Sequence, residues 1–195
     1  MPRVSEAHLA ARRQQILDAA RRCFLRNGFH STSMQDVIAE AGLSVGAVYR
    51  YFRSKTEIIA AIAEGYAIEV KHVLGDLPVD RGHGLSEVMQ RAVEVIDANV
   101  GPDGMMRLAV QVWAEAMRDP AVAAVARQIY GTMRGNFVQL AQRAIRAGEL
   151  PADADAEAVG ATLFSLVLGY ALQRMLTGQP DLEGYRRGLR ALLGR

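Results

Sequence analysis

The chain has 195 residues, half of them apolar and 23% charged, so it can bury a core and is not expected to be disordered. A single cysteine, Cys23, excludes an internal disulfide framework, and the polar, basic stretch MPRVSEAHLAARRQQ does not resemble a secretory signal peptide. The most apolar stretch, 161–176, is interrupted by Gln173 and Arg174, so we expect no membrane span and a cytoplasmic location.

The net charge of +2 is unevenly distributed along the chain. Residues 1–55 hold nine Lys or Arg against four Asp or Glu, whereas residues 56–195 hold fourteen against seventeen. A basic first quarter indicates that this segment binds an anionic partner, such as nucleic acid. Ordinary surface charge explains this observation equally well, so the charge pattern alone decides nothing.

The spacing of apolar residues is helical almost throughout, and strand signals are scarce. We predict about nine helices, at 9–27, 34–41, 45–51, 55–74, 85–99, 104–117, 120–147, 154–177 and 181–193, with a loop at 75–84. The predicted fold is all-α, with an N-terminal three-helix helix-turn-helix domain joined by the fourth helix to a larger C-terminal bundle. The predicted division is 1–54 for DNA binding and 55–195, and the resemblance of residues 31–62 to a known family implies ligand binding and dimerisation for the second part.

Capping residues set these boundaries. Predicted caps and stops are Asn27-Gly28, Thr32 or Ser33, Gly42, Ser44, Ser54 with Glu57 in a capping box, and Asp119-Pro120.

Two short helices joined by Gly42-Leu43-Ser44 describe a helix-turn-helix. Val48 and Phe52, four residues apart, are predicted to hold the second short helix against the core. Gly46 then lies on the outer face, where a missing side chain lets the backbone approach DNA closely. The alternative is that Gly46 is incidental and that the aromatic residues near it belong to the core.

The run STSMQDVIAEAGLSVGAVYRYFRSKTEIIAAI, residues 31–62, resembles the DNA-binding domain of the TetR family of transcriptional regulators. The matching elements lie without gaps at Thr32-Ser33, 36–39, 41–44, Gly46, 48–49, 51–52 and Lys55. The resemblance implies an all-helical homodimer that binds a palindromic, double-stranded DNA operator through this domain. It also implies that the C-terminal bundle binds a small molecule that releases the DNA.

By matching position, the resemblance implies which side chains meet DNA. Those expected to face bases are Gln35, Val45, Gly46, Ala47 and Tyr49, and those expected to face the backbone are Ser33, Ser44, Arg50, Tyr51 and Lys55. Val45 and Ala47 are apolar where many members carry polar or basic residues. Base readout is therefore expected to depend on methyl contacts to thymine, on Gln35 and Arg50, and on DNA shape.

The helices at 104–117 and 120–147 are rich in methionine and aromatic residues, which suit an adaptable pocket for an apolar or aromatic ligand. The candidate lining is Met105, Trp113, Met117, Tyr130, Met133, Phe137 and Phe164, and the candidate polar contacts are Gln128, Thr132, Asn136 and His72. For any single residue of the lining, plain core is the simpler explanation.

The last two helices, 154–177 and 181–193, are expected to form the homodimer contact. The small residues expected to allow close approach are Gly160, Ala161, Ser165, Gly169 and Ala171, and those expected to fill the seam are Leu163, Leu166, Val167, Leu172, Leu189 and Leu192.

Catalytic and metal signals are poor. Glu69 and His72 have the spacing of half a di-iron site, but the sequence holds no second copy. We therefore expect no enzyme activity, no metal and no cofactor. The leading hypothesis is a repressor released from a palindromic operator by a small hydrophobic ligand, or regulated by a protein partner. The alternative is a helical enzyme or carrier for a hydrophobic molecule that does not bind DNA.

Overall fold

The structure is a computed structural model that describes residues 6–76 and 84–194, and within these residues it contains nine helices and no strand. The helices are α1 (Glu6–Asn27), α2 (Met34–Ala41), α3 (Val45–Tyr49), α4 (Lys55–Asp76), α5 (Leu85–Asp97), α6 (Met105–Ala116), α7 (Pro120–Arg146), α8 (Ala156–Thr177) and α9 (Leu182–Leu193). The prediction of an all-α fold is confirmed. Most of the predicted loop at 75–84 lies outside the described residues.

The boundaries of α2 and α3 follow from their caps. Ser33 Oγ accepts a hydrogen bond from the Asp36 N–H, and the Asp36 carboxylate accepts from the Ser33 N–H in return. Gly42 ends α2 in the left-handed conformation, with φ of 64°, which glycine adopts without steric cost. Ser44 then caps α3 through the Ala47 N–H. The helix-turn-helix is therefore fixed by local chemistry, as predicted.

The start of α4 differs in one detail from the predicted capping box. Ser54 Oγ accepts from the Glu57 N–H at 3.2 Å, as expected. The Glu57 carboxylate, however, accepts from the N–H of Arg53 at 2.7 Å, one residue earlier than a capping box requires. Glu57 therefore holds the turn before α4 as well as its first residues.

The chain separates into two compact units that do not match the predicted division at residue 54. The first unit comprises residues 1–65 and 108–127, and the second comprises 66–107 and 128–195. Helices α4, α6 and α7 each contribute residues to both units. The predicted division at residue 54 concerns function, and it stays a prediction.

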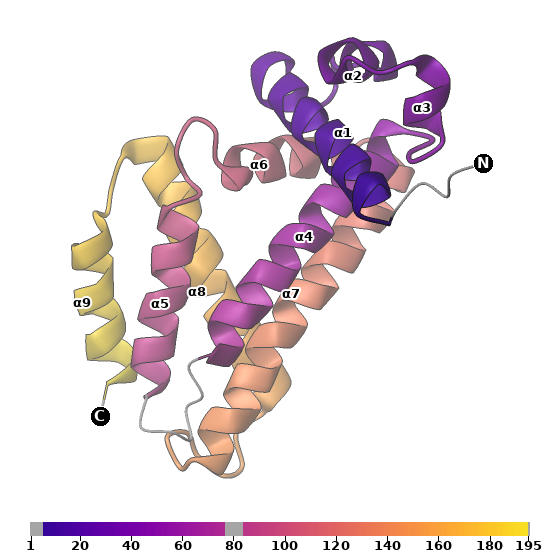
Figure 1. The fold of residues 1–195 in the computed structure, drawn as a ribbon. Coiled ribbons are helices and arrows are strands. Elements are labelled where there is room, and N and C mark those ends of the chain that lie inside the picture. The colour runs from indigo at the N-terminus through magenta and orange to yellow at the C-terminus, as the bar shows by residue number, and fades with distance from the viewer. Residues whose placement is uncertain (1–5, 77–83, 195) are drawn as a thin grey trace. The chain divides into compact units, whose positions relative to one another are not determined.

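The first unit is built around α1, across which α2 packs, with α3 following after a short turn (Figure 1). The apolar stripe of α1 is fully buried at Ile16, Cys23 and Phe24. Val37 of α2 and Val48 of α3 are also fully buried. The core of this unit therefore fixes the orientation of both short helices.

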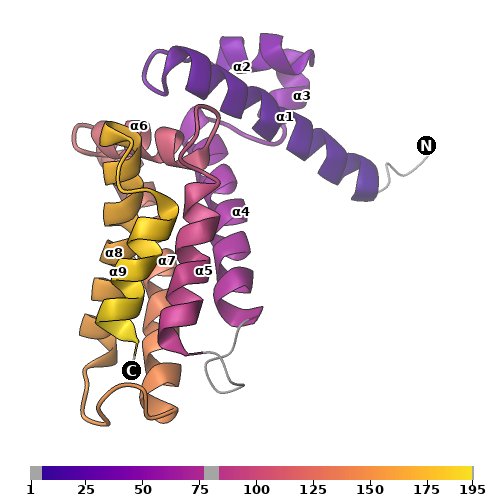
Figure 2. The ribbon, with the colours of Figure 1, turned by 90° about the vertical axis from the view of Figure 1, so that its left-hand side faces the viewer.

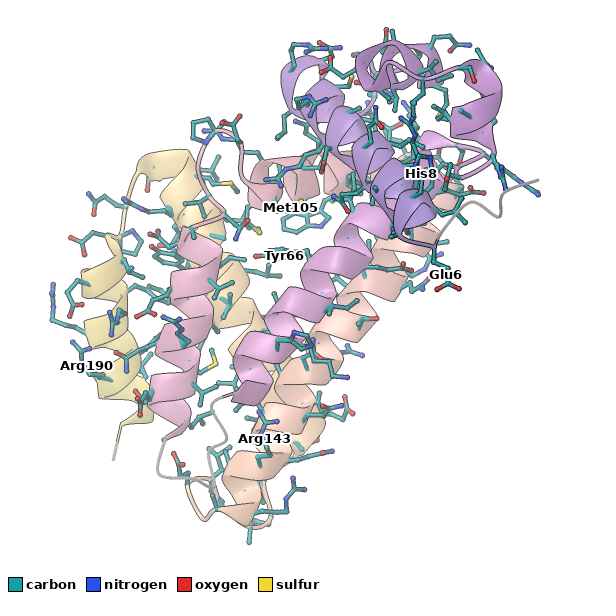
Figure 3. All side chains as sticks on the ribbon, in the orientation of Figure 1. Glu6, His8, Tyr66, Met105, Arg143 and Arg190 are labelled. Atoms are coloured by element: carbon teal, nitrogen blue, oxygen red, sulfur yellow. The ribbon has the colours of Figure 1, made fainter. Side chains whose placement is uncertain are left out.

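In the second unit, α5 lies alongside both α8 and α9 (Figures 1 and 2). Gly160 of α8 packs so closely on α7 that an added Cβ would lie 2.6 Å from the Val138 Cα. The Tyr170 hydroxyl donates to the Asp97 carboxylate, which joins α8 to α5. Arg190 of α9 donates to the amide oxygen of Gln90 on α5 at 2.8 Å (Figure 3).

Helix α8, with 22 residues, is long and apolar enough to cross a membrane by length and composition alone. The sequence-based expectation was that no segment meets this criterion. Core helices of proteins that never enter a membrane also meet it, and a single such helix is weak evidence. Within the described residues α8 contacts α5 and α7, and 33% of its most apolar stretch is buried inside the protein.

Candidate nucleic-acid interface

Helix α3 has one buried and one exposed face. Val48 is fully buried and Phe52, just beyond the helix, is 4% exposed, so both anchor α3 as predicted. Elsewhere on the helix Val45 is 59% exposed and Tyr49 is 39% exposed. These apolar and aromatic side chains are exposed to solvent, while Val48 and Phe52 pack the helix against the core. Such an exposed surface on a firmly packed helix is suited to binding a partner.

Gly46 has no side chain to cover the backbone at the start of α3. A Cβ added at this position would meet no heavy atom within 4 Å, so packing within the protein does not require glycine here. Its backbone φ is not in the left-handed region, so conformation does not require glycine either. Neither packing nor backbone conformation within the protein therefore requires glycine at position 46, and the alternative that Gly46 is incidental stays open. Of the aromatic residues near it, Phe52 belongs to the core, whereas Tyr49 is exposed.

The structure brings the residues expected to meet bases to the surface, with Gln35, Val45, Gly46 and Tyr49 exposed and Ala47 half-buried. Of those expected to meet the DNA backbone, Ser33, Ser44 and Arg50 are exposed and Tyr51 and Lys55 are half-buried. The polar atoms of Ser33, Ser44 and Lys55 already have partners within the protein. Ser44 Oγ accepts from the Ala47 N–H, whereas Ser33 Oγ both accepts from the Asp36 N–H and donates to its carboxylate.

Lys55 Nζ donates hydrogen bonds to three carbonyl oxygens of the α1–α2 turn, at 2.8 Å to Phe29, 2.8 Å to His30 and 3.1 Å to Thr32. The same ammonium lies 4.8 Å from the centroid of the Phe29 ring, in a cation–π contact. An ammonium has three N–H donors, so these carbonyls use its full capacity. Lys55 therefore ties the start of α4 to the turn that precedes α2.

The last part of α6 contacts the same turn. The Phe29 N–H donates to Gln111 Oε1 at 2.8 Å, and His30 Nδ1 lies 3.1 Å from the Glu115 carboxylate. The hydrogen bond with His30, with Arg118 contributing, lowers the pKa of Glu115 below its usual range. Residues 28–32 are thus held by α4 and by α6, and this turn sets where α2 begins.

Sequence analysis did not find Gln111 and Glu115. They lie 82 and 85 residues from their partners in the chain, and no local motif marks a glutamine or glutamate for such a contact. Only the tertiary fold places them beside the turn.

Some of the basic residues in the first quarter of the chain form ion pairs within the protein. Arg22 and Arg26 of α1 pair with Glu40 of α2 at 2.8 and 3.1 Å, which lowers the pKa of that carboxyl. Burial raises the pKa of the Cys23 thiol, consistent with a core residue rather than a nucleophile. Arg50 and Arg53 form no ion pair within the described residues, so their charges are available to an anion.

The expected pocket residues fall in both units. Trp113 and Met117 belong to the first unit, and Met117 is 88% exposed, so it is not part of a buried lining. In the second unit, Met105, Met133, Phe137 and Phe164 are buried. The Phe164 ring lies 5.4 Å from the Phe137 ring and 5.6 Å from the Tyr130 ring, between centroids. No group of metal-binding side chains occurs among the residues searched, which are those that the structure describes.

Comparison with known proteins agrees with this geometry. Residues 16–62 match the model of bacterial regulatory proteins of the tetR family, and residues 87–195 match that of the C-terminal part of BetI-type transcriptional repressors. The HTH-type transcriptional regulator UidR of Escherichia coli is 28% identical over 184 residues, covering 93% of this chain and 91% of the relative. The HTH-type transcriptional repressor Rv1474c of Mycobacterium tuberculosis is 48% identical over 63 residues, covering 32% of this chain and 34% of the relative.

Among solved structures, GusR of Salmonella enterica is similar over 100% of both chains, with a TM-score of 0.79 and 28% identity. These relatives are transcriptional regulators and not enzymes, which sets aside the alternative of a helical enzyme or carrier that does not bind DNA. The chain belongs to the TetR family of bacterial regulatory proteins and is a DNA-binding transcriptional regulator.

Proposed function

We propose that the protein is a homodimeric repressor that reads a palindromic operator with α3 and is released by a small apolar ligand bound in its second unit. The observation that carries the proposal is the exposed face of α3, where Val45 and Tyr49 stand out beside Gly46. A recognition helix enters the major groove with its first residues, so an open start is the feature that close approach requires.

The proposed base contacts are made by Gln35, Val45, Gly46, Ala47 and Tyr49. Val45 and Ala47 offer methyl groups to thymine, and Gln35 offers an amide that pairs with adenine. Ser44, Arg50 and Tyr51 are proposed to contact phosphates. For Ser33 and Lys55 the internal hydrogen bonds support a positioning role instead, in which they fix α2 and its preceding turn relative to α4.

The dimer is proposed to form through α8 and α9. Residues spaced four and three apart on α8 form a stripe of small and apolar side chains that are exposed or half-buried, namely Ala158, Thr162, Ser165, Gly169, Leu172 and Leu176. Leu176 is 81% exposed and Leu192 of α9 is 74% exposed. Such a stripe suits a self-complementary contact about a twofold axis.

Several residues that the sequence assigned to the seam are buried inside the protomer instead, namely Gly160, Leu163, Val167, Ala171 and Leu189. The close approach of Gly160 is to Val138 of the same chain. The proposed interface therefore uses the other side of α8.

Two experiments test the proposal. An operator is selected by the wild-type protein from a random duplex pool, and binding is measured for wild type and Tyr49→Ala. We expect Tyr49→Ala to weaken binding and to relax base preference, because the ring is proposed to contact a base. If the ring makes no base contact, the variant will select the same sequence as the wild type. Sedimentation of the double variant Leu176→Glu, Leu192→Glu is expected to show a monomer, whereas a dimer at wild-type concentration contradicts the interface.

A further inference from the structure

Asn136 has a buried side chain whose amide nitrogen lacks a hydrogen-bond partner. Among the described residues three polar side chains are buried, namely Thr32, Gln90 and Asn136. Thr32 Oγ1 donates to the Gly28 carbonyl, and Gln90 bonds to Ser86 and to two arginines of α9. Asn136 is 8% exposed, and its Nδ2 has no partner.

Asn136 lies on α7 among apolar residues of the second unit. Met133 and Leu140, three positions before and four after it on the same face, are 8% and 0% exposed. Arg143, seven positions after it, donates to the Leu74 carbonyl on α4 at 2.7 Å (Figure 3). This face of α7 therefore looks toward the second half of α4.

The neighbouring face of α7 carries the aromatic contacts. Phe137 follows Asn136 directly, and its ring packs on Phe164 of α8, which also contacts Tyr130. The amide and these rings thus lie on adjacent faces of α7, both in the interior of the unit.

Leaving a buried N–H unpaired destabilises the folded protein, and a leucine, with the same number and branching of side-chain heavy atoms, would avoid that cost. Buried polar groups without partners are uncommon in folded proteins and call for an explanation. We propose that Asn136 donates a hydrogen bond to the ligand in the second unit and so selects ligands that carry a carbonyl oxygen on an apolar or aromatic body. This inference rests on the proposed function, because it names the chemistry of the ligand assumed there.

The ligand class follows from the groups present. The amide N–H donates to an acceptor, and the adjoining rings contact apolar surface. An amide gives no charge compensation, so an uncharged acceptor is favoured over a carboxylate. Acetophenone and α-methylstyrene form a matched pair of probes, because they differ only by an oxygen in place of a methylene.

The first measurement is the melting temperature of the full-length protein without probe. Asn136→Leu is expected to raise it by about 2–4 °C, because a buried unpaired amide is removed. Gln90→Leu, the matched control, is expected to lower it, because Arg186 and Arg190 lose their acceptor. If the melting temperature falls as much for Asn136→Leu as for Gln90→Leu, the Asn136 amide has a hydrogen-bond partner in the free protein, and the proposal is overturned.

The second measurement is the affinity of the two probes. Wild type is expected to bind acetophenone about three- to tenfold more tightly than α-methylstyrene, the factor that one hydrogen bond supplies, and Asn136→Leu is expected to bind both equally. Three results would overturn the proposal. The wild type could bind the two probes equally, the preference could persist in Asn136→Leu, or neither probe could bind. Operator binding without probe is expected to be the same for both proteins. If the wild type does not bind the operator, the proposed repressor function is contradicted. The probe measurements would still test the role of Asn136.

Discussion

Replacing Lys55 by methionine separates a structural role from a phosphate contact. Methionine keeps most of the length of the side chain and removes the ammonium. Three carbonyls of the α1–α2 turn then lose their donor, at distances of 2.8, 2.8 and 3.1 Å in the wild type. A hydrogen bond to a charged group is worth about 1.5–3 kcal/mol, and three bonds to one half-buried ammonium do not add fully. We expect a loss of about 2 kcal/mol, or about 4–8 °C in melting temperature.

The assay is operator affinity as a function of salt concentration, measured together with thermal unfolding. Lys55→Met is expected to lower affinity at every salt concentration without changing the slope of log K against log salt. The control is Arg50→Met, since Arg50 is exposed and has no ion pair within the described residues. It is expected to leave the melting temperature unchanged and to reduce the slope by about 0.9 per contact, or about 1.8 for the dimer.

An unchanged melting temperature for Lys55→Met, together with a slope reduced by about 1.8, would refute this reasoning. Lys55 would then contact phosphate directly, and its bonds to the turn would contribute little.

Three further predictions concern other positions. Gly46→Ala is expected to raise the melting temperature slightly, because alanine favours a helix by up to about 1 kcal/mol, and yet to weaken operator binding; tighter binding would contradict the open start of α3. Gly160→Ala, whose Cβ would lie 2.6 Å from the Val138 Cα, is expected to cost about 1–3 kcal/mol in urea unfolding, whereas Gly169→Ala, with nothing within 4 Å, is the neutral control. The pKa of Glu40 is lowered in the folded state by two arginines of α1, so its stabilisation is present above about pH 4.5 and is lost as the pH falls through the folded value. Glu40→Gln is therefore expected to show a shallower decline of melting temperature between about pH 5 and 3, and curves of equal steepness would exclude the effect.

The helices and the helix-turn-helix could be predicted from the sequence, because both depend on local chemistry. Ser33, Gly42 and Ser44 act on backbone groups within a few residues of themselves, and their effect can be read without knowing the fold. The apolar spacing of Val48 and Phe52 likewise indicated which side of α3 is buried, and so which residues of α3 are left exposed. The matches to known regulators cover this same segment.

The contacts that hold this segment, and the residues that are buried in the bundle, became known from the three-dimensional fold. Gln111 and Glu115 reach a turn more than eighty residues away, and Lys55 points into that turn rather than outward. The sequence named Met117 and Asn136 alike as pocket candidates, but the fold leaves Met117 88% exposed and buries Asn136 with its amide nitrogen unpaired. Such outcomes depend on which helices pack against each face. That packing is set by contacts between distant residues, which the spacing of residues along one helix does not specify.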